Sequence, residues 1–433
     1  MKRREFFGVA GTVGLGLSLP WSLREARAQG TSAAQPYSGP FWVMLHASGG
    51  WDPTSLCDPK GRANEGERDP VNMYFRGDIR SAGNLLYAPV EGMDPFFQNY
   101  ASRLLVINGI DTTTNGHDQG VRGVWSGRTA EGYPALAALI AGTYGSNLPM
   151  SLINSGGYGQ TAGVARAVRL GEDANLLYRL ARPAQVDPPR STRSYFDSEA
   201  IVQAVGQARD ERLQRQMART LLPRMRNAQN RLFLARVGER DLAQVVDFLP
   251  AQLDRDGQRA QVQVALAAYR AGASVSVSLG MGGFDTHGNH DQDHLPRLVQ
   301  FLNLASFVLE EADRQGVADR IVLVMGSDFG RTPNYNSGRG KDHWPITSMM
   351  LLGPGIQGNR VLGATNERHG PLKIDPNTFA PSEAAGSIKL SIEHVHRALR
   401  RFAVVPDTYV RRFPLGGQDL PIFGPLPATS SAT

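Results

Sequence analysis

The chain has 433 residues, of which 41% are hydrophobic and 20% are charged. This composition excludes a disordered chain and predicts a folded protein with a sizeable core. The formal net charge is only +6, and residues 1–28 contribute +3 of it, so the charge gives no support for a nucleic-acid partner. A single cysteine, Cys57, excludes an internal disulfide and any cysteine-based metal cluster.

Residues 1–28 have the pattern of an export signal. The pair Arg3-Arg4 precedes a short apolar stretch from Phe6 to Leu19, and Ala26-Arg27-Ala28 is a small-x-small cleavage motif. Paired arginines are typical of a twin-arginine (Tat) signal, which predicts the Tat translocase as a partner during export and a periplasmic or secreted protein. The alternative is an uncleaved N-terminal anchor. Because no second long apolar run follows, we expect no integral membrane protein.

The remainder of the chain alternates between apolar runs and helix-forming segments. Residues 29–40 are rich in small and polar residues and predict a linker. Strands are predicted at 41–47, 104–110, 150–154, 274–279, 321–325 and 347–352, and helices from about 116, at 134–144 and at 295–309. This alternation predicts an α/β domain over 41–415, with a mainly parallel sheet flanked by helices. A mostly helical insertion at about 196–271 and a flexible tail at 416–433 complete the prediction.

Aspartate and histidine residues follow four of these strands and precede a fifth. They are Asp52, His117 with Asp118, Asp285 with His287, Asp328, and then Asp342 with His343. In open α/β sheets ligands bind beyond the carboxyl ends of the strands, so we expect these side chains to meet at one edge. Carboxylate oxygen and imidazole nitrogen both bind zinc, and a mixed set also accepts manganese or iron.

Each of these residues also has a purely structural interpretation. Taken singly, Asp52 and Asp328 are typical N-caps of a following helix, and His117 is typical of a loop histidine with its own hydrogen bonds. Residues 284–294 are harder to explain in that way, because they hold three histidines and three aspartates. This density favours metal binding. His290 and His294 within it either share a helical face at the site or only flank it.

The order of these motifs resembles the alkaline phosphatase–sulfatase superfamily. More closely, it is similar to an uncharacterised branch of Tat-exported bacterial proteins that share a domain of unknown function. The resemblance covers about residues 41–410. It is carried by GGWD (49–52), Trp125-Ser126-Gly127, GGFDTHG (282–288), SDFGRTP (327–333) and GKDHWP (340–345).

The resemblance implies two sites for a divalent metal ion, with zinc, manganese and calcium left open. One would be held by Asp52 and Asp328, and the other by Asp285, His287 and His343. It further implies a phosphate or sulfate ester, or another anionic small molecule, as the substrate. Arg122, as a catalytic residue, and Arg331, as an anion-binding residue, could hold its oxygens, or each could form a structural salt bridge instead.

The chain departs from the superfamily pattern at two positions. Members carry Ser, Thr or Cys where the nucleophile helix begins, but this chain has His117 there. They also carry Asp-His where it has Asp328-Phe329. Three interpretations follow: one metal with activated water, His117 as a ligand or a nucleophile, or a sheet that binds without catalysing. We therefore expect an exported metal-dependent hydrolase, and the alternative is a degenerate exported binding or assembly protein on the same fold.

Overall fold

The computed structural model describes residues 37–169, 198–219 and 244–423. An eight-stranded sheet lies at its centre, in the order β12-β4-β11-β8-β1-β7-β5-β6. Its strands are β1 (Phe41–Ala47), β4 (Leu105–Asp111), β5 (Leu152–Ser155), β6 (Ala167–Arg169), β7 (Ser276–Met281), β8 (Ile321–Ser327), β11 (Ile346–Leu352) and β12 (Arg360–Leu362). Only β11 is antiparallel to its neighbours, so the predicted α/β fold with a mainly parallel sheet is confirmed.

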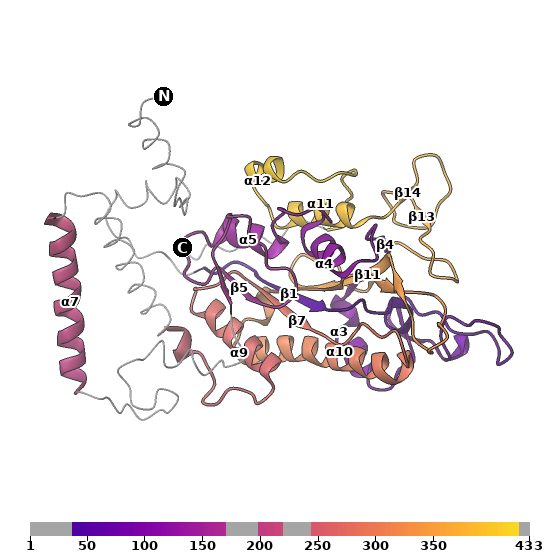
Figure 1. Ribbon diagram of the computed structural model, residues 1–433, viewed down its shortest axis with the longest axis horizontal. Coiled ribbons are helices and arrows are strands. Elements are labelled where there is room, and N and C mark those ends of the chain that lie inside the picture. The colour runs from indigo at the N-terminus through magenta and orange to yellow at the C-terminus, as the bar shows by residue number, and fades with distance from the viewer. Residues whose placement is uncertain (1–36, 170–197, 220–243, 424–433) are drawn as a thin grey trace.

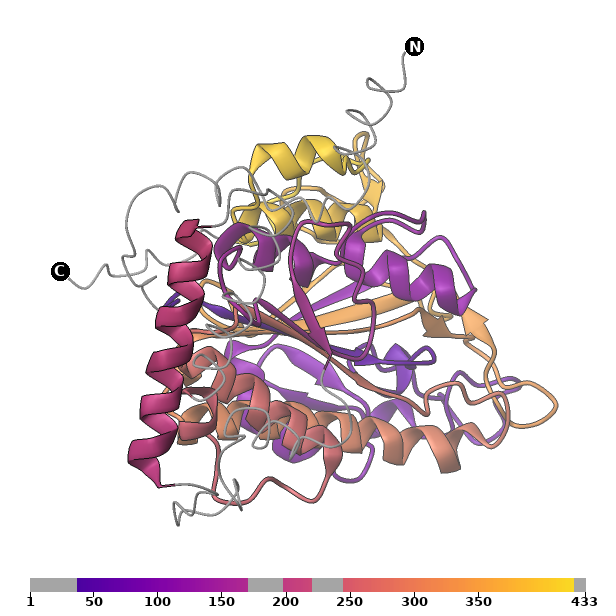
Figure 2. The same cartoon turned by 60° about the vertical axis from the view of Figure 1, so that its left-hand side comes forward.

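Helices cover both faces of this sheet (Figure 1). One layer contains α4 (His117–Ser126), α5 (Leu136–Tyr144), α11 (Ile392–Phe402) and α12 (Asp407–Arg412), and the other contains α3 (Asp94–Tyr100), α9 (Gly257–Arg270) and α10 (His290–Arg314). Figure 2 shows the two layers with the sheet between them. Strand β1 is apolar throughout because both of its faces are buried. Val43 and Leu45 pack in the core on the α9 and α10 side, whereas Trp42 and Met44 pack in the core on the α4 and α5 side.

Short elements complete the described chain. Three small hairpins pair β2 (Arg80–Ala82) with β3 (Leu85–Tyr87), β9 (Gly330–Arg331) with β10 (His343–Trp344), and β13 (Lys373–Ile374) with β14 (Ile388–Lys389). The 3-10 turns are η1 (Pro53–Ser55), η2 (Arg76–Asp78), η3 (Ala101–Arg103) and η4 (Ala318–Arg320). The helix α7 (Glu199–Arg219) stands apart from the two layers in Figure 1. No helix within the described ranges is both long and apolar enough to cross a membrane.

The structure moves two of the predicted domain boundaries. Helix α9 falls inside the segment predicted as an insertion, yet Val262 and Leu266 are buried in the core beneath the sheet, so α9 belongs to the main domain. Leu420 and Ile422 are also buried in the core, so the packed chain continues past the predicted boundary at residue 415. The predicted signal peptide and the linker up to residue 36 lie outside the described residues, as do 170–197 and 220–243 of the central segment and 424–433 of the tail.

One edge of the sheet collects the loops that carry the predicted site residues. Ala47 at the end of β1 pairs with both Met281 of β7 and Ser327 of β8, so these three parallel strands end at the same level. The antiparallel β11 begins at this edge, where Ile346 pairs with Asp111 at the end of β4. The loops that follow β1, β4, β7 and β8, and the segment before β11, therefore meet there.

Helix α4 carries two glycines, and one of them allows it to approach this edge closely. A Cβ atom at Gly120 would lie 2.6 Å from the carbonyl oxygen of Asp328 and 2.9 Å from the ring of Phe329. A Cβ atom at Gly123 would meet nothing closer than 3.4 Å, the methyl group of Thr129. The first glycine thus permits the contact that brings the start of α4 to the end of β8, and the second does not limit it.

We therefore expect opposite effects from the same substitution at these two positions. Gly120→Ala forces α4 away from β8 and should lower the free energy of unfolding by about 1–3 kcal/mol. Gly123→Ala removes a helix-interior glycine and should be neutral or stabilising by up to about 1 kcal/mol. Urea unfolding of both variants measures the difference. Equal losses in the two proteins would contradict the close approach at Gly120.

A buried histidine joins α11 to the other end of α4. His396 is fully buried, and its Nε2 donates a hydrogen bond to the carbonyl oxygen of Val124 at 2.7 Å. Its Nδ1 has no hydrogen-bond partner. Burial lowers the pKa of His396 to about 3, so the ring is neutral in the folded protein.

This histidine should make folding sensitive to acid. Between pH 6.5, near the ordinary pKa of histidine, and about pH 3, the unfolded chain binds a proton at His396 that the folded chain does not. Stability at this site is therefore complete above pH 6.5 and falls by up to about 1.4 kcal/mol per pH unit below it. His396→Gln removes the titrating group while retaining an N–H donor. The variant should show a shallower loss of unfolding free energy than wild type between pH 6.5 and 4.5, and parallel curves would contradict this.

Candidate metal site

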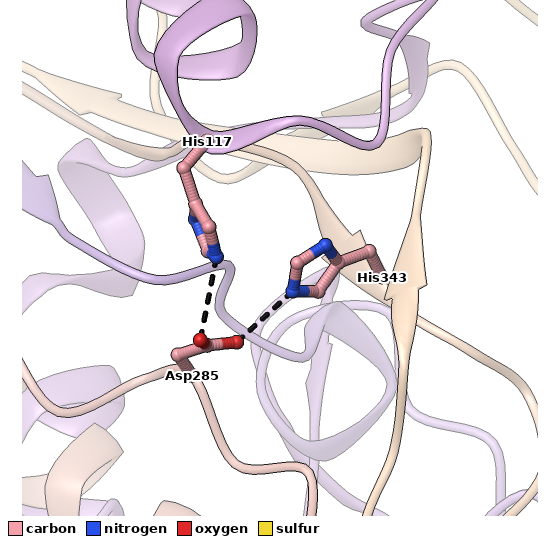
Figure 3. Close-up of side chains that lie close together, drawn as sticks. All are labelled: His117, Asp285 and His343. Carbon is pink, nitrogen blue, oxygen red and sulfur yellow. Dashed lines mark hydrogen bonds and ion pairs between the residues drawn. The ribbon is translucent and has the colours of Figure 1, made fainter.

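Three imidazole rings, those of His117, His287 and His343, converge on the carboxylate of Asp285, and Figure 3 shows the first and the last of them. His117 Nε2 lies 3.4 Å from Oδ2, and His343 Nε2 lies 3.0 Å from Oδ1. His287 Nε2 lies 3.0 Å from Oδ1 and 3.0 Å from His343 Nε2. One ligand atom from each of His117, Asp285 and His343 lies within 4.8 Å of the others, as in a metal site. The sequence prediction that joined Asp285, His287 and His343 therefore agrees with their placement, and His117 joins them.

These four residues, which we call the His3Asp cluster, come from different parts of the fold. His117 is the first residue of α4, Asp285 and His287 lie between β7 and α10, and His343 begins β10. All four side chains are partly exposed, from 21% for His343 to 47% for His287. The cluster is therefore open to a ligand at the edge of the sheet.

Each ring of the cluster is oriented through its Nδ1 by a group that can only accept a hydrogen bond. His117 Nδ1 donates to Asp328 at 2.7 Å, His287 Nδ1 donates to Asp342 at 2.8 Å, and His343 Nδ1 donates to the carbonyl oxygen of Asn115 at 2.7 Å. A neutral ring that carries its proton on Nδ1 has a lone pair on Nε2. All three Nε2 atoms therefore present lone pairs toward Asp285, and histidine ligands of metals are commonly oriented in this way.

The donor set fits a cation for an electrostatic reason. Three lone pairs and a carboxylate face one another at 3.0–3.4 Å, and such an arrangement is repulsive unless a proton or a metal ion lies among them. Partial burial alone would raise the pKa of Asp285, but the hydrogen bond and positive charge of Arg331 are foremost among the contacts that outweigh burial and hold the pKa well below its usual range. The carboxylate is therefore charged. A nitrogen-rich set with one carboxylate suits zinc or another transition metal better than calcium, which prefers oxygen ligands.

Asp328 supports His117 and does not itself face the centre of the cluster. It is buried, its Oδ2 also accepts from the backbone of Gly49 at 3.2 Å, and its Oδ1 lies 2.9 Å from His46 Nε2. Trp125 Nε1 donates to His46 Nδ1 at 3.0 Å, which leaves the proton of His46 on the nitrogen that faces Asp328. Burial opposes the charge on Asp328, yet the contacts with His46 and His117 lower its pKa. His46 was missed by sequence reasoning, although a histidine inside an apolar strand is a signal for a buried polar contact.

The two predicted arginines, Arg122 and Arg331, both form salt bridges within the protein. Arg331 is fully buried and donates to the carbonyl oxygens of Gly49, Gly50 and Lys341 and to Asp285 Oδ1 at 2.7 Å. Its guanidinium thus holds Asp285 and the loop after β1, which is the structural salt bridge that the sequence left open, and its role as an anion-binding residue stays a prediction. Arg122 lies five residues after His117 on α4, about 140° around the helix, and it donates to the carbonyl of Thr129 and to Glu131. This is the structural salt bridge that the sequence left open for Arg122, and its role as a catalytic residue stays a prediction.

Asp52 lies in a separate and fully buried cluster. Its Oδ1 caps η1 by accepting from the backbone and hydroxyl of Thr54, which is the structural interpretation that the sequence left open. Its Oδ2 forms an ion pair with Lys341 at 2.6 Å. Burial would raise the pKa of Asp52, but Lys341 and His290 lower it well below its usual value. The structure thus gives Asp52 and Asp328 different partners, and the metal ion that the sequence assigns to the pair stays a prediction.

A closed circuit of hydrogen bonds surrounds Asp52. Its backbone N–H donates to His294 Nε2 at 2.9 Å, His294 Nδ1 and His290 Nδ1 both contact Thr286 Oγ1, and His290 Nε2 contacts Asp52 Oδ2 at 3.1 Å. The backbone donor fixes every proton in this circuit: His294 donates to Thr286, Thr286 donates to His290, and His290 donates to Asp52. Burial lowers the pKa of both histidines, so both are neutral. His290 and His294 therefore flank the His3Asp cluster. They support it through Thr286, which lies between Asp285 and His287 in the sequence.

The aromatic ring of Phe329 lies at the position where members of the superfamily carry a histidine ligand. Phe329 is fully buried, and its ring centroid lies 4.5 Å from that of His343 and 5.0 Å from that of His117. Nearby hydroxyl groups are already used: Thr112 donates to backbone carbonyl oxygens, and the buried Ser126 donates to the carbonyl oxygen of Arg122. Among the described residues, no serine, threonine or cysteine side chain forms a hydrogen bond with the His3Asp cluster.

The chain belongs to the family described as "Protein of unknown function (DUF1501)", whose model matches residues 42–379. The expected membership of a family with a domain of unknown function is thus confirmed. No curated protein sequence matches the chain significantly.

The chain is also similar to several solved structures. They include the PsFucS1 sulfatase from Pseudoalteromonas sp. (9% identity, 94% of this chain and 73% of that chain, TM-score 0.38), the lipoteichoic acid synthase LtaP from Listeria monocytogenes (7%, 79% and 73%, 0.35) and the alkaline phosphatase from the Antarctic bacterium TAB5 (11%, 73% and 93%, 0.29). These TM-scores lie below 0.5 and support no conclusion about the site.

The role of Asp328 can be tested through the tautomer of His117. In Asp328→Asn, the amide group that faces His117 can donate to Nδ1, which moves the ring proton to Nε2 and removes the lone pair that faces Asp285. We expect zinc affinity to fall about 10- to 100-fold, measured by calorimetry, and the ¹⁵N shifts of His117 to report the other tautomer in metal-free protein. Asp291→Asn is a matched control, because Asp291 accepts from Tyr335 and contacts no residue of the cluster. Unchanged affinity in Asp328→Asn would contradict the orienting role.

Proposed function

We propose that this protein is an exported metal-dependent hydrolase that acts on phosphate or sulfate esters. The observation that carries the proposal is the convergence of three Nε2 lone pairs on Asp285, each fixed from behind by an acceptor at Nδ1. His117, His287, His343 and Asp285 would hold one divalent cation. When bound, such a cation polarises an ester oxygen and lowers the pKa of a water molecule, so that a nucleophile forms near neutral pH.

Charge balance supports an anionic substrate. Arg331 already pairs with Asp285 at 2.7 Å, and the partners of the three rings hold a ring proton on Nδ1, on the side away from Asp285. A divalent cation held there would therefore keep most of its positive charge toward the exposed side. Asp328 and Asp342 accept from the Nδ1 atoms of His117 and His287, and a carboxylate in this position orients a histidine ligand and strengthens its hold on a cation.

The attacking group is proposed to be water. The helix start that carries a hydroxyl or thiol in the superfamily carries His117 in this chain, and the nearest hydroxyl on α4, that of Ser126, is buried and bonded to its own helix. His117 Nε2 lies 3.4 Å from Asp285 Oδ2, within the set of ligands. We therefore assign His117 the role of a ligand and not that of a nucleophile. Export rests on the Tat pattern of residues 1–28.

A binding or assembly protein on the same fold is the competing function. The aromatic ring of Phe329 in place of a ligand and the lack of a hydroxyl contact at the cluster favour it. The two functions differ in a measurable way, because a binding protein needs no hydrolysis of an ester bond.

Metal content and ester hydrolysis should rise and fall together. The full chain, purified without chelator and supplied with zinc or manganese, should contain metal by elemental analysis and hydrolyse aryl phosphate or aryl sulfate esters. Asp285→Ala with His343→Ala should lose both properties, with at least a 100-fold loss of hydrolysis, because two of the four ligands are gone.

His394→Ala is the matched control for that experiment. His394 lies on α11, where it forms a capping box with Ser391, and it is outside the cluster. It should retain metal and activity. If the double variant kept its metal, the proposed site would be wrong, and if wild type bound metal but hydrolysed no ester of either kind, the binding protein would be the better assignment.

A further inference from the structure

The second metal ion that the superfamily resemblance implies does not fit this chain. Asp52 is fully buried and already accepts five hydrogen bonds, from the backbone and hydroxyl of Thr54, from Ser55, from His290 and from Lys341. Asp328 is committed to His46 and His117. Neither carboxylate keeps an oxygen that faces open space, so the pair cannot hold a metal between them.

The two histidines near Asp52 do not offer it a metal ligand either. His294 uses the lone pair of Nε2 to accept from the backbone of Asp52, and His290 presents an N–H group, not a lone pair, to Asp52 Oδ2. Both assignments follow from the single backbone donor at the start of the circuit. A metal ion would have to break this circuit before either ring could bind it.

The buried cluster around Asp52 already contains a cation, the ammonium group of Lys341. Lys341 is fully buried, and its Nζ lies 2.6 Å from Asp52 Oδ2, 2.7 Å from Asn72 Oδ1 and 3.3 Å from Thr54 Oγ1. All three partners are oxygen atoms, the kind of donor that hard cations take. Three partners also match the three N–H groups of an ammonium, so the charge is fully satisfied.

We propose that the ammonium of Lys341 takes the place of the second cation, so that the centre binds one metal ion and not two. The claim of a single bound metal ion depends on the proposed function, whereas the claim that Lys341 is the buried cation does not.

Hydrogen bonds join the segment of Lys341 directly to the segment that carries Asp285 and His287. Arg331 bonds both the carbonyl oxygen of Lys341 and Asp285, and the backbone N–H of Lys341 donates to Thr286, which lies between Asp285 and His287.

The first test is the number of metal ions bound. Zinc is added in excess to the full metal-free chain, weakly bound metal is removed by gel filtration, and the remainder is counted by elemental analysis. About one equivalent per chain is expected. Two equivalents would overturn this inference and leave the proposed hydrolase standing. No metal would overturn the proposed function, and the place of Lys341 would then be decided by the second test alone.

The second test is chemical rescue of the buried cation. Lys341→Ala leaves Asp52 unpaired and should lower the Tm by several degrees or more. Methylammonium chloride should restore much of that Tm, whereas sodium chloride at the same concentration should not, because the space fits an alkylammonium group. Lys60→Ala is the matched control: Lys60 pairs with Asp58 at 2.9 Å but keeps some exposure, so its Tm should respond equally to both salts.

A variant that does not fold by itself still gives a result. In that case Lys341→Ala is refolded from urea in methylammonium chloride or in sodium chloride, and the yield of folded protein replaces the Tm. A higher yield in methylammonium is expected. In Asp52→Asn with Lys341→Met the buried charges are both removed, so this variant should fold without either salt. Equal responses of Lys341→Ala to the two salts would overturn the assignment of Lys341 as the resident cation.

Discussion

The arrangement of the candidate site depends on the neutralisation of Asp52 in a place that water does not reach. A buried carboxylate without a partner would cost several kcal/mol, and loss of one partner from a buried pair costs about 3–5 kcal/mol. Lys341 removes this cost at 2.6 Å. Because Lys341 directly precedes Asp342 and His343, the residue that stabilises the buried layer also fixes the segment that reaches the exposed cluster.

The segment that carries Asp285 and His287 is fixed by the same layer. Thr286 contacts His290 and His294 in the buried circuit, whereas its two neighbours Asp285 and His287 belong to the exposed cluster. The backbone hydrogen bond from Lys341 to Thr286, at 3.1 Å, ties the two segments to each other. The partly exposed ligands are therefore held by a buried layer that needs no metal for its own stability.

The sequence predicts elements well where local pattern decides them and poorly where tertiary contacts decide them. Residues 41–47 were predicted as a strand with the bounds that the structure has, because a strand buried on both faces is apolar throughout. The same pattern at 347–352 says nothing about direction, and β11 is antiparallel. The three-residue β12 was missed because it is too short and too exposed to form a pattern.

The same distinction applies to the site. The density of histidine and aspartate at 284–294 favoured metal binding by that segment, which contributes Asp285 and His287, and the superfamily resemblance added His343. The sequence does not show which charge is neutralised by which partner. Arg331 therefore appeared free to bind an anion, and Asp52 appeared free to bind a metal, although each is consumed by a partner that is distant in sequence.

Because of these partners, the carboxylates of Asp285 and Asp328 have different roles in the proposed chemistry. Asp285 stands in front of the rings and is neutralised by Arg331, whereas Asp328 stands behind His117 and directs its lone pair forward. Negative charge behind the rings strengthens their binding of a cation, and a neutralised carboxylate in front leaves that cation with charge to spare. In the proposed hydrolase, an edge arranged in this way would take up a cation first and an anionic ester second. Lys341 supplies the remaining positive charge of the centre from within the protein.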